Sequence, residues 1–409
     1  EGGRLPLTRL LGDALDYGRG AIPATHSQAL CTAGKRDELM AVPGFAQTFL
    51  HDGAVPQAGT RFVQSRLAAT LDHLARNGLD DFYRGELAQS MASDLAAVGS
   101  PVSLADLNRH EAVWKTPLAL QHSPGKIYNM PPPTQGVVSL MILGQLDRLF
   151  KGDMDPLGAS YVHACVEATK QAFKIRDREI TDPAHMRIDP QSLLAPAALH
   201  AMAQALSADR ALPWGQGKGP ADTVWMGVID KDGVAVSFIQ SIYHEFGSGI
   251  VLDQSGVNWQ NRGCSFSLDP AARNPLMGGR KPFHTLNPAM AHFDDGRIMV
   301  YGNMGGDGQP QSQSAVFSRI ANFGMNPQAA IDAPRWLLGR TWGQVSDTLK
   351  LEARFPQTTI DALRALGHEV DVLLPYDETM GHAGAVVMHP GGLFEGGSDP
   401  RSDGACVGW

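Results

Sequence analysis

The feature that most constrains the fold of this sequence is a hairpin pattern between residues 224 and 240. Residues 224–229 are apolar and rich in β-branched side chains, as is typical of a buried strand. Residues 230–233 read Asp-Lys-Asp-Gly, and Gly233 is able to adopt the positive φ that a tight turn requires. Residues 234–240 supply the return strand. We therefore predict a β-hairpin whose first strand begins at Thr223.

Thr223 directly follows a loop of turn-forming residues, Gly-Gln-Gly-Lys-Gly-Pro-Ala-Asp at 215–222. An exposed loop of this composition bends sharply and is open to cleavage. After cleavage of the Asp222–Thr223 bond, Thr223 would carry an α-amine beside its hydroxyl. Such an amine titrates near ~8, so it can take up the hydroxyl proton without a histidine base. The pattern fits an N-terminal nucleophile, although an ordinary threonine at a strand start has the same appearance.

Separated motifs along the chain resemble the gamma-glutamyltranspeptidase family. They are the hairpin itself, Phe-Gly-Ser-Gly-Ile-Val at 246–251, Gly-Asn-Met-Gly-Gly at 302–306 and Gly-Gly-Ser-Asp-Pro-Arg-Ser-Asp-Gly at 396–404. The resemblance implies an α+β fold, the four-layer α-β-β-α sandwich of N-terminal-nucleophile hydrolases. It also implies a zymogen that cleaves itself between Asp222 and Thr223. Residues 1–222 would be part of the large subunit and would lack its N-terminal segment, and residues 223–409 would be the small subunit.

The resemblance assigns catalytic roles to four positions. Thr223 would be the nucleophile, and Ser241 replaces a threonine whose hydroxyl bonds to the nucleophile in the family. The backbone N–H groups of Gly305 and Gly306 would form the oxyanion hole. From the residues alone, Ser241 could instead bond to its own backbone. The glycine-rich segment 302–308 could instead be a simple helix start or, more weakly, a phosphate loop, for which the Gly-Lys-Ser/Thr ending is absent.

The expected substrate-binding positions differ from those of the true transpeptidases. Those enzymes bind the α-amino group of the substrate with a Gln or Glu and an Asp, and this chain has Arg262 and Ser265 at these two positions. His284 and Thr285 stand where those enzymes have a pair of serines. An arginine there should repel an ammonium group and attract an anionic acyl group. It could also be an arginine on a solvated strand end. The pattern resembles the acylase-like branch of the family, and most of all its oxamate-hydrolysing members.

The resemblance therefore implies an amidohydrolase that cleaves a small, oxamate-like anionic amide through an acyl-Thr223 intermediate. A cephalosporin or glutaryl acylase and a γ-glutamyl hydrolase or transferase are the alternatives within the family. From a different class, the chain could be a binding protein that is never processed. The expected partners are the amide substrate and the second subunit produced by cleavage, and a homo-oligomer is left open. The compartment is left open between bacterial cytoplasm and periplasm, with the cytoplasm favoured.

Composition and charge argue against a disordered chain, a nucleic-acid-binding protein and a membrane-spanning protein. A hydrophobic content of 43% in 409 residues predicts a folded chain with a large core. The net charge of −8, without any basic run, argues against a nucleic-acid partner. The longest apolar run, residues 136–144, is too short to span a bilayer. No cofactor or metal is expected: His163 and Glu167 share a helix face, but a solvated or locally hydrogen-bonded pair explains them better than a metal site without a third ligand.

Periodicity predicts helices between the motifs and strands in the second part of the chain. Helices are expected over 63–77, 82–98, 137–149, 161–180, 192–206, 309–323, 327–333 and 358–366. Strands are expected over 250–252, 297–301, 368–374 and 383–388. Ser103 and Asp106 are spaced as in a helix capping box.

Overall fold

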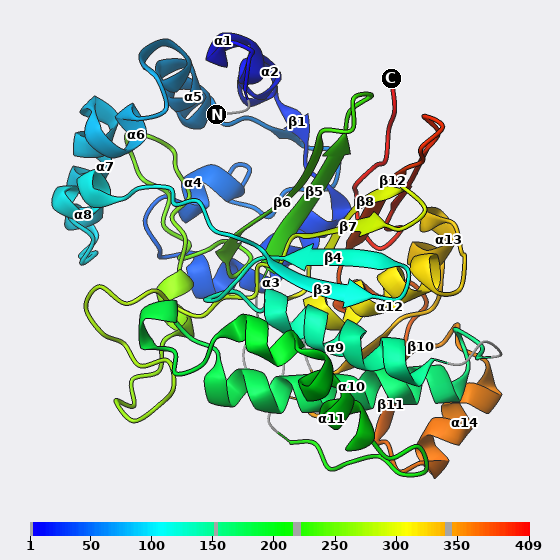
Figure 1. The fold of residues 1–409 in the computed structure, drawn as a ribbon. Coiled ribbons are helices and arrows are strands. Elements are labelled where there is room, and N and C mark those ends of the chain that lie inside the picture. The colour runs from blue at the N-terminus through cyan, green and yellow to red at the C-terminus, as the bar shows by residue number, and fades with distance from the viewer. Residues whose placement is uncertain (1–2, 151–153, 216–221, 340–345) are drawn as a thin grey trace. The chain divides into compact units, whose positions relative to one another are not determined.

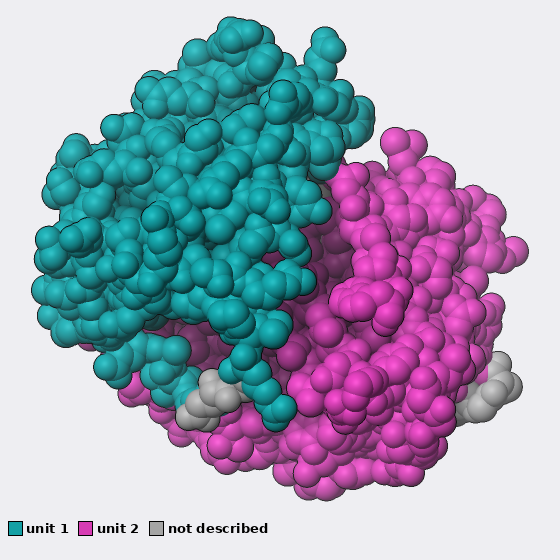
Figure 2. Space-filling model, turned by 90° about the horizontal axis from the view of Figure 1, so that it is seen from above, with its two compact units in different colours: residues 1–114, 244–261 teal, residues 115–243, 262–409 magenta. Residues whose placement is uncertain are grey.

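The computed structural model describes residues 3–150, 154–215, 222–339 and 346–409. The chain forms two compact units, coloured separately in Figure 2. Unit 1 comprises residues 1–114 and 244–261, and unit 2 comprises residues 115–243 and 262–409. The predicted cleavage point between Asp222 and Thr223 lies inside unit 2, so the packing units are not the two predicted subunits. A cut of the Asp222–Thr223 peptide bond need not follow the boundary of a packing unit, and the division into two subunits stays a prediction.

Unit 1 is mostly helical (Figure 1). Its elements are α1 (Leu7–Leu10), α2 (Gly12–Gly20), β1 (Ile22–Pro23), α3 (His26–Leu39), α4 (Phe45–Phe49), β2 (Arg61–Phe62), α5 (Ser65–Asn77), α6 (Asp81–Arg84), α7 (Glu86–Ala97) and α8 (Leu104–Arg109). Residues 250–252, predicted as a strand, form only an isolated bridge, Val251 with Asn258. The capping box of Ser103 and Asp106 at the start of α8 is confirmed.

The single helix predicted over 82–98 is wrong, because the structure has α6 and α7 separated at Gly85. The Asp81 carboxylate accepts a hydrogen bond from the backbone N–H of Leu87, 3.0 Å away, in the first turn of α7. It also lies 2.8 Å from His73 Nε2, on α5. A carboxylate at the start of a helix satisfies N–H groups that have no partner within the helix. Asp81 thus starts a new helix instead of continuing the old one.

Unit 2 holds the sheets and the long helices. Its helices are α9 (Gly136–Leu149), α10 (Ala159–Glu179), α11 (Pro196–Gln204), α12 (Gln309–Ala321), α13 (Pro327–Asp332) and α14 (Gln357–Ala365). Its strands are β3 (Leu118–His122), β4 (Gly125–Asn129), β5 (Asp222–Ile229), β6 (Ala235–Tyr243), β7 (Ala289–Phe293), β8 (Ile298–Asn303), β9 (Trp336–Leu338), β10 (Leu349–Glu352), β11 (Val370–Leu373), β12 (Ala383–Met388) and β13 (Phe394–Ser398). Within the described residues, no helix combines the length and apolar character needed to cross a membrane.

The six-stranded sheet of unit 2 is antiparallel throughout, in the order β13-β12-β8-β7-β4-β3 (Figure 1). β9, β10 and β11 form a smaller sheet, and β5 and β6 form the predicted hairpin, with Gly233 at a φ of 83° in its turn. Sheets that are antiparallel except for the parallel β10–β11 pair, covered by helices, give the predicted α+β class, which is thereby confirmed.

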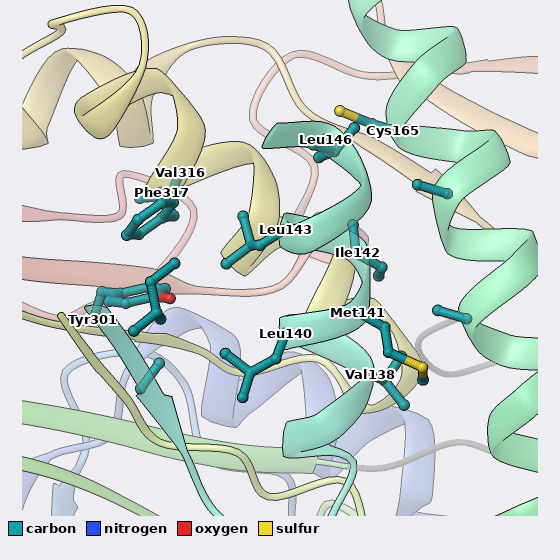
Figure 3. Close-up of a cluster of buried hydrophobic side chains, with 14 of the residues drawn as sticks. Val138, Leu140, Met141, Ile142, Leu143, Leu146, Cys165, Tyr301, Val316 and Phe317 are labelled. Carbon is teal, nitrogen blue, oxygen red and sulfur yellow. The ribbon is translucent and has the colours of Figure 1, made fainter. Parts of the chain in front are cut away.

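One face of the six-stranded sheet carries the main core. Helix α9 packs on β3 and β4 and against α10 and α12, so its first eleven residues are buried on every side. Figure 3 shows this cluster, in which side chains of α9 meet Tyr301 of β8 and Phe317 of α12. The opposite face of the sheet is contacted by the hairpin, because β5 packs on β8 and β12. Unit 2 is therefore layered as helices, sheet and hairpin.

Trp225 anchors the hairpin to the sheet. A Cβ added at Gly302 of β8 would lie 2.0 Å from Trp225 Cδ1, and one at Gly384 of β12 would lie 2.4 Å from Cζ3. These two glycines are partners in the β8–β12 ladder, so they form one shallow groove for the indole ring. The indole N–H donates a hydrogen bond to Ser237 Oγ at 3.0 Å. Because Trp225 is two residues from Thr223, this packing sets the position of the predicted nucleophile.

Gly302→Ala is expected to destabilise the protein by about 1–3 kcal/mol, because the new methyl group overlaps the Trp225 ring. It should also slow any cleavage before Thr223, since the hairpin must shift. Urea unfolding and intact mass at fixed times after synthesis measure the two effects. Gly391→Ala is the matched control, because a Cβ there meets no atom within 4 Å. Equal behaviour of the two variants would contradict the anchoring role of Trp225.

Candidate active site

Thr223 lies opposite a β-bulge in the hairpin. The ladder between β5 and β6 shifts register between Asp222 and Val224, so that Ser241 and Ile242 together oppose Thr223. Bulges place two residues against one and re-aim side chains, and they are frequent next to active sites. The two hydroxyl residues predicted to act together, Thr223 and Ser241, are therefore neighbours across the hairpin.

The predicted oxyanion-hole glycines lie in the turn between β8 and α12. Gly305 has a φ of 132° and Gly306 a φ of 49°, values at which a side chain would be strained. A short 3-10 helix, Gly306–Gly308, leads into α12, whose first residue is Gln309. Gln309 Nε2 lies 3.5 Å from Thr223 Oγ1. The glycine turn therefore ends at the side chain that reaches the predicted nucleophile.

A cavity of about 380 Å³ in unit 2 contains all four predicted substrate-binding residues in its lining. These are Arg262, Ser265, His284 and Thr285. Arg262 and Ser265 lie in a short 3-10 helix, Arg262–Ser265, and His284 and Thr285 lie in the segment before β7, while Arg176 of α10 lines the same cavity, so the cavity depends on tertiary folding. Its size suits a small acyl group. Their roles in substrate binding stay predictions.

Arg262 is the predicted anion-binding group. Its guanidinium carbon lies 4.3 Å from the centre of the Tyr243 ring, and its Nη2 lies 3.4 Å from Ser241 Oγ. Burial lowers the pKa of Arg262 to about 10, against the opposing effect of Tyr243. The guanidinium therefore remains charged at neutral pH in a partly desolvated place, where an anion is attracted more strongly than in water.

Four polar atoms in the cavity wall are buried without a hydrogen-bond partner among the described residues. They are Ser265 Oγ, Arg273 Nε, His284 Nδ1 and Thr285 Oγ1. Buried polar groups normally find partners, so such atoms in a cavity wall indicate a place for a polar ligand or water. Burial, with smaller contributions from Arg262 and Lys281, lowers the pKa of His284 to about 4. The cavity thus presents a neutral imidazole beside a charged guanidinium.

The cavity residues that sequence reasoning missed include Tyr243, Arg176 and Asp307. Tyr243 has a φ of 84°, which is unusual for a non-glycine residue, and its N–H donates to Ser241 Oγ at 2.9 Å. Arg176 and Asp307 form an ion pair of 2.9 Å between α10 and the glycine turn. Nothing in the local pattern of either residue signals this contact, since they lie 131 positions apart.

His163 and Glu167 on α10 are joined by a third group that sequence spacing did not reveal, His368. One ligand atom from each lies within 4.8 Å of the others, so these residues could hold a cation. Their atoms are already hydrogen bonded, with His163 Nδ1 2.8 Å from His368 Nε2 and Lys170 Nζ 2.7 Å from Glu167 Oε1. Both residues of the predicted pair are buried, and their hydrogen bonds go to other groups: His163 to His368 and the Ser207 carbonyl, and Glu167 to Lys170 and the Leu212 N–H. The expected absence of a metal stays a prediction.

Comparison with known proteins agrees with this geometry. The family model described as Gamma-glutamyltranspeptidase matches residues 1–409. The chain belongs to the gamma-glutamyltranspeptidase family. As a family member it is a hydrolase of the N-terminal-nucleophile type, which confirms the predicted family, fold class and enzyme class.

Relatives within the gamma-glutamyltranspeptidase family include two named proenzymes. The chain is 57% identical to the oxamate amidohydrolase proenzyme of Klebsiella pneumoniae subsp. pneumoniae, over 100% of this chain and 77% of that protein. It is 39% identical to the glutathione hydrolase-like YwrD proenzyme of Bacillus subtilis, over 100% of this chain and 78% of that protein. Among solved structures, cephalosporin acylase from Bacillus halodurans superposes with a TM-score of 0.89 at 31% identity, over 99% of this chain and 75% of that chain.

Proposed function

We propose that this family member is a self-processing amidohydrolase that hydrolyses oxamate or a similarly small anionic amide. The observation that carries the proposal is the placement of Arg262 in the cavity wall together with Ser265, His284 and Thr285. The ammonium-binding partners of a glutamyl substrate are replaced there by a cation and neutral groups. The 57% identity to an oxamate amidohydrolase proenzyme supports the same substrate class.

In the proposed maturation, Thr223 Oγ attacks the carbonyl carbon of Asp222 and displaces the Thr223 nitrogen. Water then hydrolyses the resulting ester, which leaves a carboxylate on Asp222 and an α-amine on Thr223. The second subunit, residues 223–409, stays with the first as its partner in the mature enzyme. The bulge at Ser241 and Ile242 supports this step, because it interrupts the regular pairing of the hairpin at Thr223, next to the bond that is cleaved.

In the proposed hydrolysis, Thr223 Oγ attacks the amide carbonyl while its proton passes to the α-amine. The oxygen of the tetrahedral intermediate accepts hydrogen bonds from the backbone N–H groups of Gly305 and Gly306. The C–N bond breaks, and the α-ammonium returns its proton to the leaving nitrogen, so ammonia departs and an acyl ester remains on Thr223. Water then attacks the ester, giving the dicarboxylate and the regenerated hydroxyl. Arg262 holds the substrate carboxylate throughout.

Substrate comparison on purified, processed protein tests the proposal. We expect ammonia release from oxamate with a kcat/KM at least about 100-fold above that for γ-glutamyl-p-nitroanilide, because an ammonium beside the Arg262 guanidinium costs several kcal/mol. Glutaryl-p-nitroanilide tests the second candidate, a glutaryl or cephalosporin acylase, which the likeness to the Bacillus halodurans acylase favours. Faster turnover of either anilide than of oxamate would overturn the proposed substrate.

A further inference from the structure

Gln135 joins the glycine turn to the wall of the cavity. Its side chain is fully buried at the start of α9. Its Nε2 donates a hydrogen bond to the backbone carbonyl of Gly306 at 2.8 Å and a longer one to the carbonyl of Thr285 at 3.4 Å. One amide group therefore bridges the predicted oxyanion turn and a predicted substrate-binding residue.

Arg176 sets the orientation of that amide. Arg176 Nη1 donates to Gln135 Oε1 at 3.3 Å and to Asp307 Oδ1 at 2.9 Å, and the Arg176 side chain is almost completely buried. An arginine has no acceptor atom, so it can face only the oxygen of the amide, and the Nε2 group must point toward the two carbonyls. Burial opposes the charge of Arg176, yet Asp307 and Asp177 raise its pKa above the usual value. Arg176 therefore keeps its charge at neutral pH.

The glycine turn needs such an external support. Gly305 and Gly306 both adopt positive φ values, and glycine has the largest conformational freedom of any residue. A donor that stabilises a tetrahedral oxygen is effective only when it is held in place before the reaction. In this turn, the carbonyl of Gly306 is held by Gln135, and the next side chain, Asp307, is held by Arg176.

We propose that Gln135 is a positioning residue that holds the Gly305–Gly306 turn in the geometry required for oxyanion stabilisation. Arg176 and Asp307 maintain the orientation of Gln135 and of the turn. The inference rests on the proposed function, because it assigns the oxyanion role to this turn. Gln135 touches neither the nucleophile nor the substrate carboxylate. Its loss should therefore change the rate of the chemical step and leave substrate affinity unchanged.

The test compares Gln135→Met with Gln145→Met. Methionine keeps the length and volume of glutamine but cannot donate to a carbonyl. Gln145 is the matched control, because it lies on the same helix, is equally buried and donates to two backbone carbonyls, those of Met141 and Ala168. Intact mass gives the processed fraction of each variant, and rate constants are expressed per processed molecule.

For oxamate, Gln135→Met is expected to lower kcat by about 10- to 100-fold while KM changes by less than about 2-fold, a partial loss of oxyanion stabilisation. Gln145→Met should leave both constants within about 2-fold, even if its thermal stability falls equally. A loss of kcat no larger than in the control would overturn the proposal. A raised KM at unchanged kcat would overturn it as well, because Gln135 would then act on substrate binding.

Acylation by p-nitrophenyl acetate provides a second arm that does not depend on the natural substrate. This ester requires only the nucleophile and the oxyanion donors, so Gln135→Met should slow its p-nitrophenolate burst by a similar factor, and Gln145→Met should not. If the processed wild-type protein releases no ammonia from oxamate but shows this difference in burst rate, the proposed substrate fails and the positioning role stands. Equal burst rates in both variants would refute the positioning role, whatever the substrate.

Discussion

Thr223→Ala is expected to yield one uncut chain without amide hydrolysis. The variant loses the oxygen that attacks both the Asp222 carbonyl and the substrate, so both reactions lose their nucleophile. Removing the nucleophile of a hydrolase typically lowers kcat by about 10⁴- to 10⁶-fold. Denaturing intact mass measures the cleavage, and ammonia release from oxamate measures the activity. The wild-type protein should give two fragments, the second beginning at Thr223.

Thr223→Ser is the conservative control, because it keeps the hydroxyl and removes only a methyl group. It should be cleaved, more slowly or to a smaller extent than the wild type, and should retain hydrolytic activity well above Thr223→Ala. The circular dichroism spectrum of the alanine variant should match that of the wild type, since Thr223 is only partly buried. A cut alanine variant would disprove the assignment of Thr223, and an uncut wild-type chain would remove its main support.

The elements best predicted from the sequence are those whose signals are local. The hairpin, its Gly233 turn and the capping box at Ser103 depend on residues within a few positions, and the structure confirms them. The predicted burial of the first strand is wrong, because Val224, Met226 and Val228 are 45%, 49% and 55% exposed. The apolar periodicity of residues 82–98 predicts one helix and does not show the break between α6 and α7. Asp81 makes this break through its contacts with Leu87, inside that segment, and with His73, on another helix. A periodic pattern of apolar residues cannot reveal a side chain that caps a new helix within it.

The candidate site shows the same division between local and tertiary signals. The positions of Arg262 and His284 could be read from motif spacing, and folding brings both to one cavity. Gln135, Arg176 and Asp307 could not be read in this way, since a glutamine after prolines and an arginine on a long helix have no local signature. Their importance arises only where α9, α10 and the glycine turn meet.

Arg262→Ala is expected to raise the KM for oxamate strongly with a smaller change in kcat. Truncating one partner of a buried charged pair costs about 2–5 kcal/mol, and Arg262 is only partly buried, so we take the lower end, about 30-fold in kcat/KM. Steady-state kinetics of ammonia release provides the measurement. Arg178→Ala is the control, because its side chain is 67% exposed and pairs only with the adjacent Glu179 among the described residues. That variant should leave both constants unchanged.

The pH dependence of KM gives a second readout of the same charge. His284 has a pKa of about 4 and Arg262 one of about 10, so neither changes its charge between about pH 6 and 8.5. The α-amine of processed Thr223 titrates near this range in the wild type and in Arg262→Ala alike, so the ratio of the KM of Arg262→Ala to the wild-type KM should be flat between about pH 6 and 8.5 and fall only as Arg262 loses its proton near pH 10. A wild-type KM that changes near pH 6.5 would contradict the neutral His284 and the constant cation.

Reversal of specificity would be the sharpest evidence for the role of Arg262. Arg262→Gln combined with Ser265→Asp restores the residue types that bind the α-amino group in the true transpeptidases. The double variant should lose oxamate hydrolysis and gain turnover of γ-glutamyl-p-nitroanilide relative to Arg262→Gln alone, because a carboxylate is needed to pair with the ammonium group. If the double variant still preferred oxamate, the preference would have to come from other residues of the cavity, and Arg262 would lose its assigned role.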